Sequence, residues 1–540
     1  MPSRARSVLT ALVPLFALSL ASRAAHATEY RADPSTFTAM LPMLRAGDTL
    51  ALAAGRYTRP LNITNLNATA ASPIVITGPA SGDPAVFVAD PGACCNTIEL
   101  RNSSYVTIQR LTVDGNHVDG VFGLSAKDGM ANNVHHITVQ DNTFTNHDGS
   151  QQTVAISTKT PTWGWIIRRN RILSPGTGMY LGNSDGTSPF VEGIIENNLI
   201  ENSIGYCMQI KWQAPWPAIM GLPSGSTATL IRHNVFIKND RPSPDGARPN
   251  VLVGGFPASG NGSMNRYEIY GNLFVHNSTA AEGLLQASGR VSVHHNIFVD
   301  AAGHAILVAN HDRPLLRAWI YDNTIYSTAT GIRVGTAPEG IIVTGNAIFS
   351  NTAIAGTPTM MRENLTDSVA NAAMHVTAPA VTLGSMDFYP KPGRCQGPAN
   401  DHSTFAMDQD FNRDFNGTDA TPFRFRGAYA GEGANSGWRL AADIKGTMSA
   451  PPIMDGGTAP ADASVTPTDS GTIAPSADSS LPAQDATSSD GGNTTPMPAG
   501  CACRAPSRAP SSPRSMLALV ALVCAAAAPR KRPHHKSSHR

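Results

Sequence analysis

The sequence has no excess of charge of either sign. Its 540 residues contain 40 Lys and Arg against 39 Asp and Glu, a formal net charge of +1. Eleven basic residues lie at the ends, three in residues 1–27 and eight in residues 501–540, and neither end contains an acid, so the remainder carries −10. Six of its acids lie in residues 446–500, which leaves residues 28–445 near −4. Without a basic field, there is no reason to expect a nucleic-acid partner.

Motifs for metal binding and for two-carboxylate hydrolysis are also missing. The seven cysteines form no CxxC pair and no His-rich pair accompanies them, which argues against metal ligation. Cys94, Cys95, Cys207 and Cys395 lie in the expected folded region and allow three pairings, including a bridge between the two adjacent residues. The NTD, DD and GHG motifs of the β-helix polygalacturonases are absent. Glycoside hydrolysis by paired carboxylates is therefore not expected.

What is present begins with a repeated phrase, an alternating apolar strand that ends at an asparagine. Intervals between these asparagines are 28, 28, 36, 38, 24, 27 and 23 residues. A repeat of this length marks a stacked architecture, and two-residue alternation makes each unit a strand. Asparagine tolerates the left-handed conformation of a sharp turn, and its amide can bond to the amide of the next coil. The eight copies centre on Asn142, Asn170, Asn198, Asn234, Asn272, Asn296, Asn323 and Asn346.

These features predict an all-β chain, a single right-handed parallel β-helix of the pectin-lyase-like solenoid kind over residues 28–445. Apolar spacing in residues 34–44 predicts a short helix that caps the first coil. The following Gly47-Asp48-Thr49-Leu50-x-Leu52 and Gly55-x-Tyr57 resemble the opening segment of the chondroitinase B and alginate lyase family. The resemblance implies the β-helix fold and an activity on polysaccharide, with Lys and Arg as base and acid beside a calcium ion.

The N-terminus has the features of a secretory signal peptide. Arg4 and Arg6 precede an apolar run over residues 8–20, and Ala25-His26-Ala27 offers a small-residue cleavage site. Signal peptidase is therefore an expected partner of residues 1–27. The mature chain is expected outside the cytoplasm, where cysteines can be oxidised.

The C-terminal part divides into a spacer and a tail. Residues 446–500 are rich in Ser, Thr, Pro, Asp, Ala and Gly, without an aromatic residue, Lys or Arg, and are expected to be disordered. Cys501 and Cys503 then precede an apolar stretch over residues 516–528 and a basic end. This stretch is shorter than the roughly 20 residues of a membrane-spanning helix.

The order of cysteine motif, short apolar segment and basic end resembles the myxobacterial C-terminal sorting signal, the MYXO-CTERM type. That resemblance implies removal of the tail by a sorting protease and retention at the outer cell surface, through a lipidated Cys501 or Cys503. Plain membrane tethering and release into the medium are the alternatives.

A second phrase recurs between the asparagines and predicts a solvent-facing stripe. Alternation leaves every second residue of GMYLG, CMQIKWQ, GLLQAS and GIRVG outside the helix. The stripe then includes Tyr180, Gln209, Lys211, Gln286 and Arg333. The two long intervals indicate insertions on one face, often the binding face of a repeat protein. They carry Trp212 and Trp216, whose indoles suit stacking on sugar rings or, equally, pinning of the loops to the helix wall.

The stripe is basic and rich in amides, which favours β-elimination from a uronate polymer. In that reaction a cation neutralises the carboxylate while a base removes the adjacent proton. We assign Lys211 as base and His311, Arg313 and Arg333 to the carboxylate and leaving group, with Arg317 as a substrate contact. Calcium could share the neutralising role, with Glu282 as its ligand. A non-catalytic carbohydrate-binding or adhesive surface protein is the alternative, uronate epimerisation a third possibility, and a monomer is expected.

Overall fold

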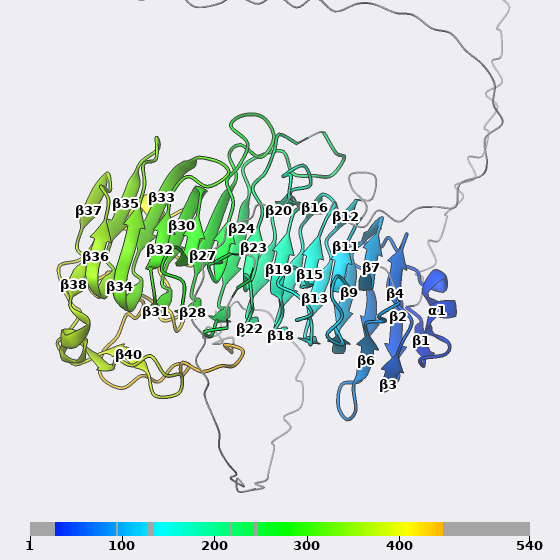
Figure 1. The fold of residues 1–540 in the computed structure, drawn as a ribbon. Coiled ribbons are helices and arrows are strands. Elements are labelled where there is room, and N and C mark those ends of the chain that lie inside the picture. The colour runs from blue at the N-terminus through cyan, green and yellow to red at the C-terminus, as the bar shows by residue number, and fades with distance from the viewer. Residues whose placement is uncertain are drawn as a thin grey trace, which may run out of the picture. The chain divides into compact units, whose positions relative to one another are not determined.

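The computed structural model describes residues 27–92, 95–127, 133–216, 218–241, 243–244 and 246–446. These residues form a right-handed parallel β-helix, as predicted, whose coils stack from the N-terminal cap to the last strands (Figure 1). The predictions for residues 1–26 and 447–540, with Cys501 and Cys503, lie outside the described residues. No helix in the described ranges combines the length and the apolar character needed to cross a membrane.

Each coil has three faces. Face 1 is a 13-stranded parallel sheet, and faces 2 and 3 together form the 21-stranded sheet, because β34 and β36 run from one face into the other. Face 1 contains β1 (Glu29–Ala32), β2 (Thr49–Leu52), β5 (Ile74–Thr77), β9 (Val106–Gln109), β13 (Thr138–Gln140), β17 (Ile166–Arg168), β21 (Ile194–Glu196), β24 (Ala228–Arg232), β27 (Arg266–Tyr270), β30 (Gly289–His294), β33 (Leu315–Tyr321), β35 (Ile341–Thr344) and β37 (Met360–Arg362).

Face 2 follows the asparagine corner and face 3 follows face 2. Face 2 contains β3 (Gly55–Tyr57), β6 (Ala85–Val88), β10 (Leu111–Asp114), β14 (Thr143–Thr145), β18 (Arg171–Leu173), β22 (Leu199–Glu201), β25 (Val235–Ile237), β28 (Leu273–Asn277), β31 (Ile297–Ala301), the first parts of β34 (Thr324–Val334) and β36 (Ala347–Ala355), and β38 (Leu365–Asp367). Face 3 contains β4 (Leu61–Thr64), β7 (Asn96–Arg101), β11 (Phe122–Ala126), β15 (Val154–Thr158), β19 (Thr177–Leu181), β23 (Met208–Ile210), β26 (Val251–Val253), β29 (Gly283–Ala287), β32 (His304–Val308) and the second parts of β34 and β36. A short fourth sheet joins β8 (Ser103–Ser104), β12 (Val134–His135), β16 (Thr162–Trp163) and β20 (Phe190–Val191).

The predicted cap covers the first coil. It consists of α1 (Phe37–Met40) and the 3₁₀ turn η1 (Leu41–Met43). Phe37 is fully buried and meets the rings of Tyr57 and Phe87 edge-on, with centroids 5.3 and 5.6 Å apart. The helix thus closes the apolar interior where the stack begins.

The asparagines form a continuous buried ladder at the corner between faces 1 and 2. In each coil the side-chain Oδ1 accepts hydrogen bonds from the backbone N–H and the Nδ2 of the preceding asparagine, as Asn234 does from Asn198 at 3.0 and 2.9 Å. Its own Nδ2 donates to the next asparagine and to a backbone carbonyl, here Asn272 and Ile195. The ladder runs from Asn142 to Asn346 and continues to a ninth member, Asn364.

The prediction that the asparagine itself adopts the left-handed conformation of the corner was wrong. The left-handed residue is the one before the asparagine, for example Arg169 (φ 51°), His233 (φ 57°) and Asp322 (φ 51°). The asparagine itself is chosen for its amide, which both donates and accepts inside the stack. The recurrence of asparagine at the corner is therefore not due to its tolerance of left-handed backbone.

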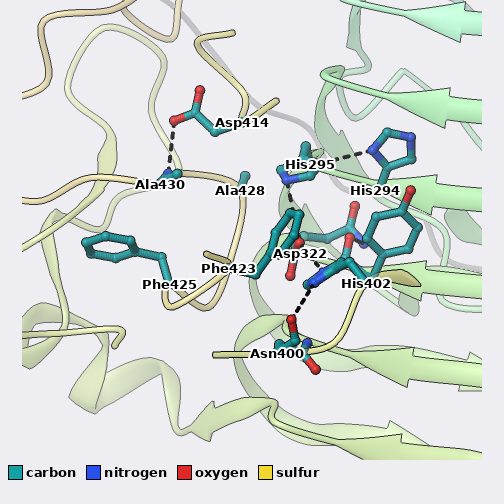
Figure 2. A network of polar contacts seen from close by, with 12 residues as sticks. His294, His295, Asp322, Asn400, His402, Asp414, Phe423, Phe425, Ala428 and Ala430 are labelled. Atoms are coloured by element: carbon teal, nitrogen blue, oxygen red, sulfur yellow. Dashed lines mark hydrogen bonds and ion pairs between the residues drawn. The ribbon is translucent and has the colours of Figure 1, made fainter. Parts of the chain in front are cut away.

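After β38 the chain folds back along the outside of the helix, where it covers face 2 and part of face 1. This C-terminal segment contains η3 (Val369–Met374), β39 (Val376–Ala378), β40 (Asp387–Pro390) and η4 (Ser403–Phe405). His402 Nε2 lies 2.7 Å from Asp322 Oδ2, and the His295 Nδ1 lies 2.9 Å from that of His294 (Figure 2). Burial lowers the pKa of His295 to about 4. The segment is therefore held by buried polar contacts as well as by apolar packing.

The cysteines are not all equivalent. Cys95 is disulfide-bonded. Cys207 and Cys395 are buried and carry free thiols, so these two do not pair with each other. Burial raises the pKa of Cys207 to about 11 and that of Cys395 to about 12.

Candidate functional site

The stripe predicted from alternation is one row of register partners on face 3. Tyr180 pairs with Gln209, and the row continues to Gln286 and Arg333 through two leucines. This part of the row consists of Ser157, Tyr180, Gln209, Leu252, Gln286, Leu307 and Arg333, and the row continues to Ser125 and Glu99 in the preceding coils. Gln209 is only 4 % exposed, so the middle of the row is covered.

The adjoining outward row carries most of the positive charge of face 3. Lys211 lies two residues after Gln209 and therefore belongs to the next outward row. The strand register and the backbone hydrogen bonds show which residues occupy the equivalent position in the preceding coils. We call this row the basic column. Its members are Arg101, Lys127, Lys159, Gly182 and Lys211.

Lys159 occupies the most unusual environment in the basic column. Its Nζ lies 3.8 Å from the centre of the Tyr180 ring, and Gly182 in the next coil places no side chain beside it. Burial, together with the ammonium of Lys211, lowers the pKa of Lys159 to about 8. Burial raises the pKa of Tyr180, and the nearby Tyr206 and Asp312 add to this effect. Near neutral pH, Lys159 can therefore exist in part as a neutral amine above a protonated phenol.

The loop after β32 brings a second group of side chains to Lys211. His311 and Arg313 bond to each other through their backbones around Asp312, which has a left-handed backbone (φ 53°). Asp312 Oδ2 lies 3.5 Å from Lys211 Nζ and 3.6 Å from His311 Nε2. The Arg313 guanidinium stacks 4.4 Å above the ring of Trp212. Two of the predicted residues, Lys211 and His311, thus lie around one carboxylate, and Arg313 lies over the adjacent Trp212.

Two predicted residues lie apart from this group. Arg333 is four coils from Gln209 along the row, about 19 Å at the usual strand spacing, and its Nη1 is 3.4 Å from His304 Nε2. Arg317 lies on β33 of face 1, where its guanidinium covers the ring of Trp319 at 3.7 Å. Neither can act on the same bond as Lys211 in this arrangement.

The two tryptophans of the long insertion are used differently. Trp212 is half-buried and contacts Arg313. Trp216 is 8 % exposed and packs in an apolar cluster with Trp163 and Leu222, which fixes the insertion to the short fourth sheet. Only Trp212 therefore stands beside the charged groups.

The surroundings of Glu282 do not suit calcium. The neighbours that lower its pKa are two cations, Arg248 and Lys238, although burial raises it overall. Calcium needs several oxygen ligands, and in the described part of the chain no group of three or more His, Cys, Asp or Glu side chains could hold a metal ion. No step is therefore assigned to a metal.

A hollow of about 630 Å³ between face 1 and the C-terminal segment is a weaker candidate. Two of its basic groups already have partners: Arg232 lies 2.7 Å from Glu196, and Lys445 Nζ donates to the carbonyl of Gly271 at 2.8 Å. Asp414 accepts the backbone N–H of Ala430 (Figure 2). Of these contacts, the hydrogen bond of Lys445 attaches the C-terminal segment to the helix.

Sequence reasoning missed Lys159 and Asp312. Lys159 was expected to be an ordinary residue of the strand surface and was given no role in the site. Alignment of Ser157 with Tyr180 would have placed Lys159 and Lys211 in the same row, and this is the signal that could have found it.

Searches against family models and curated proteins found no match. Among solved structures, an alginate lyase from Paenibacillus sp. str. FPU-7 is 13% identical, with 63% of this chain and 99% of that chain covered and a TM-score of 0.32. A GH136 lacto-N-biosidase from Eubacterium ramulus is 11% identical, covering 63% and 68% of the two chains, with a TM-score of 0.36. The A-module of a mannuronan C-5 epimerase from Azotobacter vinelandii is 14% identical, covering 62% and 94%, with a TM-score of 0.36.

Proposed function

We propose that this protein cleaves an acidic polysaccharide by β-elimination at the group of side chains formed by Lys159, Tyr180 and Lys211. The observation that supports it best is the buried lysine beside a second lysine, since a base for this reaction must be neutral yet surrounded by positive charge. Lys159 meets the first requirement, with a pKa lowered to about 8, and Lys211 and Arg313 the second. Secretion through residues 1–27 and surface retention through residues 501–540 belong to the same proposal.

The proton and electron balance of the step is as follows. The neutral Lys159 amine takes the proton on the carbon next to the uronate carboxylate, while Lys211 and Arg313 stabilise the charge that develops on that carboxylate. The electron pair of the broken C–H bond forms a carbon–carbon double bond, and the glycosidic C–O bond breaks. The leaving oxygen receives a proton from the Tyr180 phenol, whose raised pKa keeps it protonated, or from His311. Lys159 replaces Lys211 as the assigned base, because Lys211 lies beside Asp312.

The test is to incubate the purified protein with alginate, pectate, chondroitin and hyaluronan and to follow the ultraviolet absorbance of the unsaturated uronate. The rate should rise with pH around 8, as the amine of Lys159 loses its proton. Lys159→Gln should abolish the activity without lowering the thermal stability. Lys391→Gln in the C-terminal segment is the matched control and should leave the rate unchanged. Full activity in Lys159→Gln would rule out this assignment.

A further inference from the structure

The carboxylate of Asp312 is held loosely for an aspartate with left-handed backbone. Asp141 has a similar backbone (φ 57°), and its carboxylate accepts two hydrogen bonds from the guanidinium of Arg169, each 2.7 Å long. Asp312 (φ 53°) lies 3.5 Å from Lys211 Nζ and 3.6 Å from His311 Nε2, and within the described residues its side chain makes no hydrogen bond. Charge-assisted hydrogen bonds are about 2.7–2.9 Å long, so these two contacts are attractions between charges without a bond.

The backbone around this carboxylate is fixed, whereas the side chain is not. Asn310 Oδ1 accepts the backbone N–H of Leu315 at 2.8 Å and closes the loop. The loop lies directly on Gly255, where a Cβ atom would be 2.5 Å from Arg313 Cβ. The side chain of Asp312 is 37 % exposed. It can therefore rotate into water while the loop stays in place.

The turn itself does not require an acid. Glycine and asparagine also adopt left-handed backbone, and neither would place a negative charge beside Lys211. The charge of Asp312 must therefore be explained by the groups that it faces. These are Lys211 and His311 and, at longer range, the phenols of Tyr180 and Tyr206. Three of them, Lys211, His311 and Tyr180, are the groups to which the proposed reaction assigns the uronate carboxylate and the leaving oxygen.

We propose that Asp312 occupies, in the free protein, the position of the substrate carboxylate, and that a uronate displaces it from Lys211 on binding. The Asp312 carboxylate turns out to water, while the incoming carboxylate accepts a hydrogen bond from the ammonium. Lys211 thus has an anionic neighbour both before and after binding. A neutral sugar has no carboxylate to offer and leaves the pair closed. This inference rests on the proposed function, because it takes Lys211 as the group that receives the uronate carboxylate.

Binding is measured with monosaccharides, which have no glycosidic bond to cleave, so the result does not depend on lyase activity. The probes are galacturonate, glucuronate and mannuronate, each compared with its neutral hexose and titrated against the full chain by nuclear magnetic resonance. Asp312→Asn removes the charge and keeps a residue that tolerates left-handed backbone. Asp312→Gly is the second variant, since glycine suits the same backbone. Asp141→Asn, which changes another left-handed aspartate, is the matched control.

In both Asp312 variants the affinity for at least one uronate should rise about fivefold, the upper range for one partly exposed charge pair. The affinity for the neutral hexoses should not change, and Asp141→Asn should alter neither. An unchanged or lower uronate affinity, an equal gain for the neutral hexoses, or no uronate binding by any of the proteins would overturn the proposal.

The absorbance assay on polymers separates this inference from the proposed reaction. A gain in uronate affinity without cleavage of any polymer would support the exchange of carboxylates and refute the lyase. Cleavage without a gain would support the lyase and refute the exchange. If both hold, Asp312→Asn should lower the KM for the polymer by the same factor and leave kcat unchanged.

Discussion

Replacing one member of the asparagine ladder tests the account of what holds this fold together. In Asn234→Ala the backbone N–H of Asn198 loses its acceptor at 3.0 Å, and the side-chain amide of Asn198 loses one of its two. The carbonyl of Ile195 loses a donor at 2.8 Å. Asn272 Oδ1 keeps the backbone N–H of residue 234 and is not orphaned.

The expected fall in the free energy of unfolding follows from these lost hydrogen bonds. A buried donor left without a partner costs about 1–3 kcal/mol, and each further lost hydrogen bond about 1 kcal/mol. Because all these groups are buried, water cannot replace the partner, and we expect the free energy of unfolding to fall by about 3–5 kcal/mol. In a solenoid the loss should concentrate on the coils next to residue 234, since each coil packs only on its neighbours.

The assay is urea unfolding followed by circular dichroism, together with amide hydrogen exchange across residues 195–275. Exchange should accelerate there first, before the N-terminal coils respond. Asn239→Ala is the control: Asn239 is exposed, and among the described residues its side chain accepts one hydrogen bond, from the backbone N–H of Arg241, so the effect should stay within about 0.5 kcal/mol. Equal losses in the two variants would refute the reasoning that the ladder, and not asparagine as a turn residue, stabilises the stack.

Two further predictions follow from buried titratable groups. Burial lowers the pKa of His147 and of His295 to about 4, so the unfolded chain binds more protons than the folded chain between about pH 6.5 and 4, and stability should fall as the pH falls through that window. Each histidine contributes about 3 kcal/mol, whereas Asp408, whose pKa burial raises to about 6, opposes the trend, as do Glu282 and Asp414, whose pKa values burial also raises. Thermal melts across this range that show constant or rising stability would contradict the prediction. Cys207 and Cys395 should react with a thiol reagent only after unfolding, because both are buried and their pKa values are raised; rapid labelling of the native protein would count against the described packing.

The β-helix could be predicted because its signal is repeated eight times and depends on local alternation. The corner was predicted for an incomplete reason, since the left-handed position belongs to residues as different as Arg169, His233 and Asp322, and only the structure shows that the asparagine follows it. The residue that recurs in the sequence is the asparagine, whose buried side chain hydrogen-bonds from one coil to the next.

The candidate site was harder to predict because it depends on register between coils. Gln209, Gln286 and Arg333 do share a row, but sharing a row does not bring residues together when the row runs along the axis. Lys211 meets Asp312 through a loop contact across about 100 residues of chain, and no periodic pattern marks it.

The ladder and the basic column are linked by this register. The asparagine amides bond coil to coil and fix the axial position of each turn, so side chains on face 3 fall into rows whose spacing is set by the strands. Insertions such as the one carried by residues 212–216 and 218–227 leave these rows intact, because they connect face 3 to face 1 and do not interrupt the ladder. A row that contains Arg101, Lys127, Lys159 and Lys211 can therefore be assembled from strands with little local resemblance. Lys159 can be buried with a lowered pKa because the asparagine ladder that holds the coils together does not include the groups that would react.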